Sequence, residues 1–164
     1  MKIDLVIPAA EDSAFLRSRA MAVLAARSPA DAQLSLRDDI VARLDPDRDL
    51  DLAADLAAIT VSTKTALRAY ELAAAYRRAG VPVVLGGIHP TARPEGAAEH
   101  CGAVVEGEAE GLWERLLGDL RAGCRRPRYR HDELPVLAPG PLPRWDLFTS
   151  KRYVPVTTLQ ASRG

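Results

Sequence analysis

The feature that most constrains this fold is an apolar run that stops at Gly86 and Gly87, within the sequence VPVVLGGIHPT of residues 81–91. A short β-branched run of this kind is typical of a strand buried on both faces of a parallel sheet. Glycine has no Cβ, so the carboxyl end of such a strand lets another group approach the backbone closely. Open α/β sheets bind their ligands at that edge, and we therefore predict a ligand site there.

Strand and helix patterns alternate along the first 123 residues. Apolar runs predict strands, and apolar positions at helical spacing predict helices, the first of them behind a cap at Ser13. Parallel strands need crossover connections, so the alternation predicts helices on both faces of one sheet. The predicted class is an α/β fold, flavodoxin-like or Rossmann-like, with a doubly wound five-stranded parallel sheet. The expected strands are residues 3–7, 33–36, 56–61, 81–85 and 103–105, and the expected helices are residues 14–27, 66–79, 95–100 and 110–121.

We expect the α/β domain to occupy residues 1–123. Prolines crowd residues 127–143, and proline fits neither a helix interior nor a central strand. Residues 124–164 are therefore predicted to form a proline-rich carboxyl-terminal linker. An apolar stretch at residues 153–159 predicts one more strand, which has no place in the five-stranded sheet. We expect this tail to lack fixed packing on the domain and its strand to belong to a further structural unit.

The charge balance argues against two classes of partner. The chain has 22 Lys and Arg residues and 22 Asp and Glu residues, whereas nucleic acids and anionic membrane surfaces call for a basic excess. No segment reaches the roughly 18 apolar residues that a membrane-spanning helix needs. Cys101 and Cys124 have neither zinc-site nor disulfide-framework spacing, which favours a reducing compartment. We expect a cytoplasmic protein without nucleic-acid or membrane partners.

The loops that follow the predicted strands are rich in small and hydroxyl side chains, among them Ser62, Thr63 and Thr91. This composition suits a large ligand that lies along the sheet edge and is held by backbone groups and hydroxyls. No GxGxxG follows the first strand and no P-loop is present, which argues against nicotinamide and ATP binding. The third strand ends in TVST at residues 60–63, without the phosphoacceptor aspartate that a receiver domain needs.

His89 and Glu108 carry the reactive groups of these loops. His89 precedes Pro90 and can act as a ligand or donor, although a histidine at this point can equally belong to the turn. Glu108 directly follows Gly107 at the end of the fifth strand, where the dipole of the next helix also favours a carboxylate. These loops do not suit a nucleophilic enzyme site, and we predict no catalytic residues and no metal ligands in this chain.

Several stretches of the chain share the pattern of one known family: DLAAITVST at residues 55–63, RAGVPVVLGGIHPT at 78–91, AVVEGEAE at 103–110, LLGDL at 116–120, PRWDL at 143–147 and TLQASRG at 158–164. With them the chain resembles the amino-terminal cobalamin-binding domain of cobalamin-dependent radical S-adenosylmethionine enzymes. The tail also resembles the bridge from that domain into the radical barrel, whose first strand is followed by a CxxxCxxC cluster motif. We expect the sequence to stop just before that motif.

The resemblance implies that cobalamin lies over the carboxyl edge of the sheet. Many cobalamin proteins have a DxHxxG motif after the first strand, whose histidine binds cobalt from below. Here residues 8–13 read PAAEDS, so the resemblance implies a cobalt without a protein histidine beneath it. Together with the loop chemistry, it predicts a set of cofactor-binding residues. They are Ser62, Thr63, Gly86, Gly87, His89, Thr91, Gly107 and Glu108.

The function that the resemblance implies is the cobalamin-binding module of a radical enzyme that transfers a methyl group to an unactivated carbon. In the parent enzyme, a [4Fe-4S] cluster and S-adenosylmethionine would be bound by the radical barrel, which would be this module's partner. The module alone would not catalyse the reaction. The alternative is a structural or interaction domain that caps the barrel without holding cobalamin. An absorbance spectrum after reconstitution with hydroxocobalamin distinguishes the two.

Overall fold

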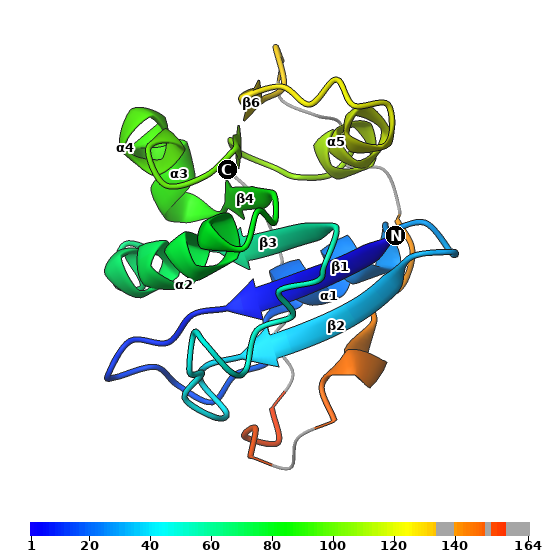
Figure 1. Cartoon of the computed structure of the whole chain (residues 1–164). Coiled ribbons are helices and arrows are strands. Elements are labelled where there is room, and N and C mark those ends of the chain that lie inside the picture. The colour runs from blue at the N-terminus through cyan, green and yellow to red at the C-terminus, as the bar shows by residue number, and fades with distance from the viewer. Residues whose placement is uncertain (134–139, 150–151, 157–164) are drawn as a thin grey trace.

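The computed structural model describes residues 1–133, 140–149 and 152–156. The described residues contain a six-stranded sheet in the order β2-β1-β3-β4-β5-β6, and every neighbouring pair of strands is parallel (Figure 1). The strands are β1 (Lys2–Ile7), β2 (Gln33–Asp38), β3 (Leu56–Thr60), β4 (Val83–Gly86), β5 (Ala103–Val105) and β6 (Arg128–Tyr129). The helices are α1 (Arg19–Ala26), α2 (Ala66–Arg78), α3 (Ile88–Ala92), α4 (Pro94–Ala98), α5 (Leu112–Arg121) and the 3-10 helix η1 (Trp145–Leu147).

Helices cover both faces of the sheet, as a doubly wound fold requires. Alternate residues along each strand point to opposite faces. Ile59 of β3 packs in one core cluster with Leu72 of α2. Its neighbour Ala58 packs in the other cluster, with Met21 of α1 and Trp113 of α5. The predicted flavodoxin-like α/β architecture is confirmed, and α2 and α1 lie on opposite sides of the sheet in Figure 1.

The sheet has six strands, so the predicted number of five was wrong. The additional strand, β6, lies beyond residue 123 and pairs with β5 through Val104 with Arg128 and Val105 with Tyr129. Tyr129 is buried in the core next to α5. A strand of only two residues, one of them an arginine, shows no apolar alternation, so only its pairing with β5 reveals it. Where the domain ends stays a prediction.

Helix α1 begins at Arg19, five residues later than the predicted start at residue 14. The Ser18 side chain caps this helix by accepting a hydrogen bond from the Met21 amide. The Ser13 hydroxyl is used elsewhere, because it accepts a hydrogen bond from the Ala10 amide at 2.8 Å. The Phe15 carbonyl accepts from the Val154 amide at 2.9 Å, so a contact with the tail replaces the helical bond that this carbonyl would otherwise make.

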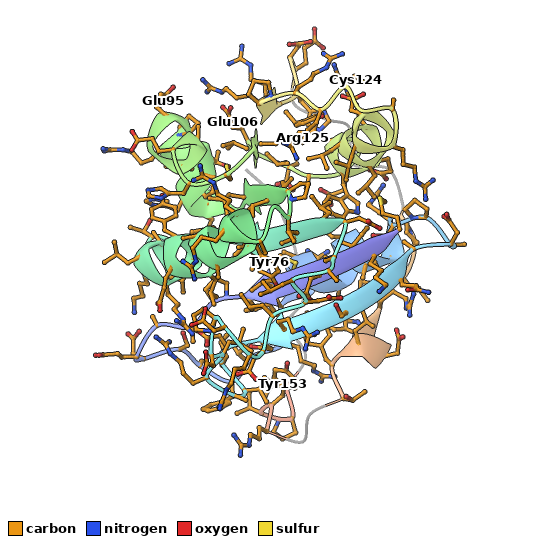
Figure 2. The ribbon with its side chains drawn as sticks, in the orientation of Figure 1. Tyr76, Glu95, Glu106, Cys124, Arg125 and Tyr153 are labelled. Carbon is orange, nitrogen blue, oxygen red and sulfur yellow. The ribbon has the colours of Figure 1, made fainter. Side chains whose placement is uncertain are left out.

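The described part of the tail packs on the domain, which corrects the expectation that it would lack fixed packing. The Arg144 amide donates to the Ala22 carbonyl of α1 at 2.9 Å, and Phe148 is buried. The Tyr153 hydroxyl donates to Asp38 at the carboxyl end of β2 (Figure 2). Residues 153–156 are not a strand, and residues 157–159 of the predicted strand lie outside the described residues.

Candidate ligand-binding site

A cavity of about 650 Å³ opens at the carboxyl edge of the sheet. Its walls come from the start of α1, the ends of β3, β4 and β5, the start of α3, and the loop of residues 107–110 with Trp113 of α5. Because α1 and α5 flank the same face of the sheet, the cavity lies between them and over β3, β4 and β5. Cavities of roughly 300–1,000 Å³ are typical of small-molecule and cofactor sites.

Small side chains form the floor of this cavity. Ala58 of β3 and Gly86 of β4 lie on its lining, beside Val84 and Val105. A Cβ added to Gly86 would lie 3.6 Å from the Val105 Cβ, which is an ordinary contact distance. The Gly86 backbone therefore accepts a side chain, and the glycine keeps space open above the sheet.

Gly87 has a different role, because its backbone requires glycine. Its φ is 110°, a conformation that other residues rarely adopt. A Cβ at this position would lie 2.8 Å from the Val61 carbonyl oxygen. Both glycines line the cavity, but only Gly87 is also needed for the close approach of β4 to the loop after β3, a difference that their sequence does not show.

Thr91 joins the two loops that form one side of the cavity. Its hydroxyl donates to the Gly87 carbonyl at 2.8 Å and accepts from the Gly107 amide at 2.8 Å. These bonds connect the β4–α3 turn to the loop after β5. The Trp113 indole nitrogen, from the next helix, donates to the Ser28 hydroxyl at 3.0 Å. Residues far apart in the sequence thus fix the cavity walls.

The structure brings most of the predicted cofactor-binding residues together. Those that line the cavity are Gly86, Gly87, Thr91, Gly107 and Glu108. Ser62, Thr63 and His89 are not among its lining residues. The Ser62 amide donates to the Thr65 hydroxyl at the start of α2, and Thr63 is exposed. The His89 Nε2 atom lies 2.9 Å from the hydroxyl of Tyr70 on α2, which covers the opposite face of the sheet.

The wall formed by helices was not predicted from the sequence. Arg19, Val23 and Leu24 of α1 line the cavity together with Trp113 of α5. An apolar helix face has the same spacing whether it covers a core or a cavity, so the spacing in these helices does not distinguish the two. The only signal for the difference is the lack of a large side chain at Ala58 and Gly86 across from them.

The buried carboxylate of Asp39 fixes the loop between β1 and α1. Asp39 accepts hydrogen bonds from the Ala9 amide at 3.0 Å and from the Leu44 amide at 2.7 Å. Arg68 of α2 adds two bonds to the same carboxylate, at 2.9 and 3.0 Å. Burial raises the pKa of Asp39, but the bonds from Arg68 and the two amides outweigh it, so the pKa lies below its usual value.

Within residues 1–133, 140–149 and 152–156, no group of three or more His, Cys, Asp or Glu side chains is arranged to hold a metal ion. None of the helices in the same residues is both long and apolar enough to cross a lipid bilayer.

A doubly wound parallel sheet with a cavity at its carboxyl edge places this chain in the class of α/β domains whose ligands bind at that edge. Residues 22–117 match the family described as the B12 binding domain. The chain belongs to this B12-binding family.

Two curated relatives come from Chlorobaculum tepidum. Bacteriochlorophyllide d C-8(2)-methyltransferase is 43% identical over 81 residues, which are 49% of this chain and 18% of that protein. Bacteriochlorophyllide d C-12(1)-methyltransferase is 30% identical over 114 residues, which are 67% of this chain and 25% of that protein. The chain therefore spans a quarter or less of the length of these relatives.

A solved structure has the same fold. It is TsrM from Kitasatospora setae, a radical S-adenosylmethionine methyltransferase, with cobalamin and a [4Fe-4S] cluster bound. The TM-score is 0.63 at 23% sequence identity, and the match covers 76% of this chain and 25% of TsrM. A second TsrM structure, with tryptophan and a S-adenosylmethionine analogue bound, has a TM-score of 0.61 at 21% identity.

Proposed function

We propose that this chain binds cobalamin in the cavity at the carboxyl edge of its sheet. The observation that carries the proposal is the position of the cavity within a domain of the B12-binding family. Its floor fits a bulky cofactor, because a Cβ at Gly86 would occupy space that the glycine leaves open. Gly86 and Ala58 would lie beneath the cofactor, and Thr91, Gly107 and Glu108 would surround it at the rim.

The parent enzyme is proposed to be a cobalamin-dependent radical S-adenosylmethionine methyltransferase that acts on an unactivated carbon. Both Chlorobaculum relatives are methyltransferases by name, and their greater length leaves room for a radical barrel beyond the part that matches this chain. Bound cobalamin would supply a carrier for the methyl group. The residues of this chain would bind and orient it, while the barrel would hold the [4Fe-4S] cluster and S-adenosylmethionine.

Reconstitution with hydroxocobalamin tests the proposal directly. We expect the chain to retain the cobalamin absorbance bands through gel filtration at a stoichiometry near one. Loss of the cofactor from folded protein would contradict the proposal and favour the alternative of a structural domain that caps the barrel.

The Gly86→Val substitution should weaken cobalamin binding without unfolding the protein. The valine side chain fits the backbone of β4, but it fills space on the cavity floor. We expect Kd to rise roughly tenfold or more, which corresponds to about 1.4 kcal/mol. Spectroscopic titration with hydroxocobalamin measures this effect, and a urea melt should show little change in stability.

Gly86→Ala provides the graded control, because it adds only the Cβ that the structure accommodates at 3.6 Å from Val105. Its Kd should lie between those of the wild type and the valine variant. Equal affinities for all three folded proteins would remove Gly86 from the site.

Bound cobalamin should have no histidine nitrogen on cobalt. Each of the chain's three histidines has another partner: His89 bonds Tyr70, His100 stacks on the Tyr70 ring, and His131 bonds the Glu110 carbonyl. We therefore expect a base-off complex whose electron paramagnetic resonance spectrum, after reduction to cob(II)alamin, lacks nitrogen superhyperfine splitting. A resolved nitrogen splitting would contradict this prediction.

A further inference from the structure

The loop between β5 and α5 forms one wall of the cavity and depends on contacts from β6. Gly107, Glu108 and Glu110 of this loop line the cavity. Gly107 and Gly111 have φ angles of 74° and 80°. Two glycines in so short a segment make the free loop flexible, so its observed shape must be held by neighbouring groups.

The beginning of the loop is fixed by β6. The Glu106 amide donates to the Tyr129 carbonyl at 2.9 Å, which continues the pairing of β5 with β6. Arg128 donates to the Glu106 carboxylate at 2.6 Å and also to Glu95 of α4 at 3.3 Å. Figure 2 shows Glu95 and Glu106 at this end of the sheet. The Glu106 side chain is only 13% exposed, so this pair is shielded more than an ordinary surface ion pair.

The end of the loop is held by His131, two residues after the last residue of β6. Its Nε2 atom lies 2.9 Å from the Glu110 carbonyl oxygen. A carbonyl oxygen only accepts, so Nε2 must carry the proton of this bond. The imidazole also packs on the next residue, since a Cβ at Gly111 would lie 3.7 Å from its Cε1 atom. The Gly111 amide is in turn bonded to Glu114 at 2.9 Å.

We propose that His131, supported by Arg128, is a positioning residue for the cofactor. It holds the wall formed by residues 107–110 in its binding shape before the ligand arrives, which lowers the conformational entropy that binding must remove. The inference rests on the proposed function. The positioning role goes beyond the proposed function, because His131 and Arg128 both lie outside residues 22–117, the part of the chain that matches the B12-binding family.

The test compares His131→Leu with His131→Gln in the full chain. Leucine fills a similar volume without a donor, whereas the glutamine amide can still donate to the Glu110 carbonyl. In ligand-free His131→Leu, we expect the Gly107 and Gly111 amides to exchange about tenfold faster, as the loss of one hydrogen bond predicts, while Ile59 in β3 keeps its wild-type rate. Hydroxocobalamin should bind about tenfold more weakly to this variant, and His131→Gln should restore most of both properties.

His100→Leu is the matched control, because His100 stacks on Tyr70 at 3.8 Å on the other face of the sheet. It should change neither the exchange of the loop nor the affinity for hydroxocobalamin. Wild-type exchange of Gly107 and Gly111 in His131→Leu would overturn the proposal, and so would faster exchange with unchanged affinity. A His131→Gln variant as impaired as His131→Leu would overturn the role of the hydrogen bond.

Failure of the proposed function is detected separately. If wild-type protein does not bind hydroxocobalamin, the proposed function is wrong and the positioning of this cofactor is overturned with it. If the wild type binds and the His131 variants bind equally well, only the positioning role is wrong.

Discussion

Gly87→Val should unfold or severely destabilise the protein. The residue has a φ of 110°, and a Cβ there would meet the Val61 carbonyl oxygen at 2.8 Å and the Val61 nitrogen at 3.1 Å. Both contacts are with backbone, which cannot turn away as a flexible side chain can. A strained φ and overpacking each cost about 1–3 kcal/mol, so we expect a loss of about 2–6 kcal/mol in the free energy of unfolding.

Urea denaturation followed by circular dichroism measures this loss. Gly86→Ala, one residue earlier, is the matched control and should be close to wild type, because its Cβ has only ordinary contacts. A Gly87→Val protein of wild-type stability would show that the turn after β4 relaxes easily. The effect on cobalamin affinity would then need to be measured before Gly87 could be given a role in the site.

Arg68→Met should cost about 3–5 kcal/mol in stability, because it removes the buried cation of the Asp39 carboxylate and leaves only the exposed Arg43 paired with it. The Arg68 and Asp39 side chains are 8% and 0% exposed, and two hydrogen bonds join them. Methionine replaces the packing of the arginine stem but not its donors. Urea denaturation at neutral pH checks the loss.

Arg43→Met tests whether burial is the cause. Arg43 bonds the same Asp39 carboxylate at 3.1 Å, but its side chain is 62% exposed. Exposed ion pairs contribute about 0–1 kcal/mol, so we expect a small effect. Equal losses for Arg43→Met and Arg68→Met would contradict the assignment of the larger effect to the buried pair.

The Arg68–Asp39 pair also makes the free energy of unfolding depend on pH in the acid range. The folded-state pKa of Asp39 is lowered, so its contribution to stability is present above the usual carboxyl pKa and is lost as the pH falls through the folded-state value. In Arg68→Met the burial remains while the guanidinium is gone, so the pKa of Asp39 should rise. The variant should therefore lose less stability than the wild type as the pH falls, because less of this contribution is left to lose, and acid titrations of the unfolding free energy would measure the difference.

The fold class could be predicted from the sequence because its signals are local. The run before Gly86 and the apolar helical spacing of residues 66–79 each report a segment's own preference for a buried strand or an amphipathic helix. A chain in which strands alternate with helices is compatible with few sheet topologies, and the doubly wound parallel sheet is the simplest of them. The carboxyl edge follows from that topology, and so does the approximate place of the site.

The parts that were not predicted depend on contacts between distant segments. The pairing of Tyr129 with Val105 creates β6, and the bond from Val154 to the Phe15 carbonyl accompanies the late start of α1. Neither leaves a periodic pattern in the sequence, because each involves one or two residues whose partner lies far along the chain.

By itself, the sequence determined the α/β class, the alternation of elements and the glycine-rich edge where a ligand can approach. Only the tertiary structure decided which face each edge residue occupies. Gly86 and Gly87 both line the cavity, Gly87 also packs against the Val61 backbone, and His89 contacts Tyr70 on the α2 side. The physical reason is that the direction of a side chain in a turn depends on backbone angles fixed by the packing of neighbouring strands and helices, which residue type alone does not specify.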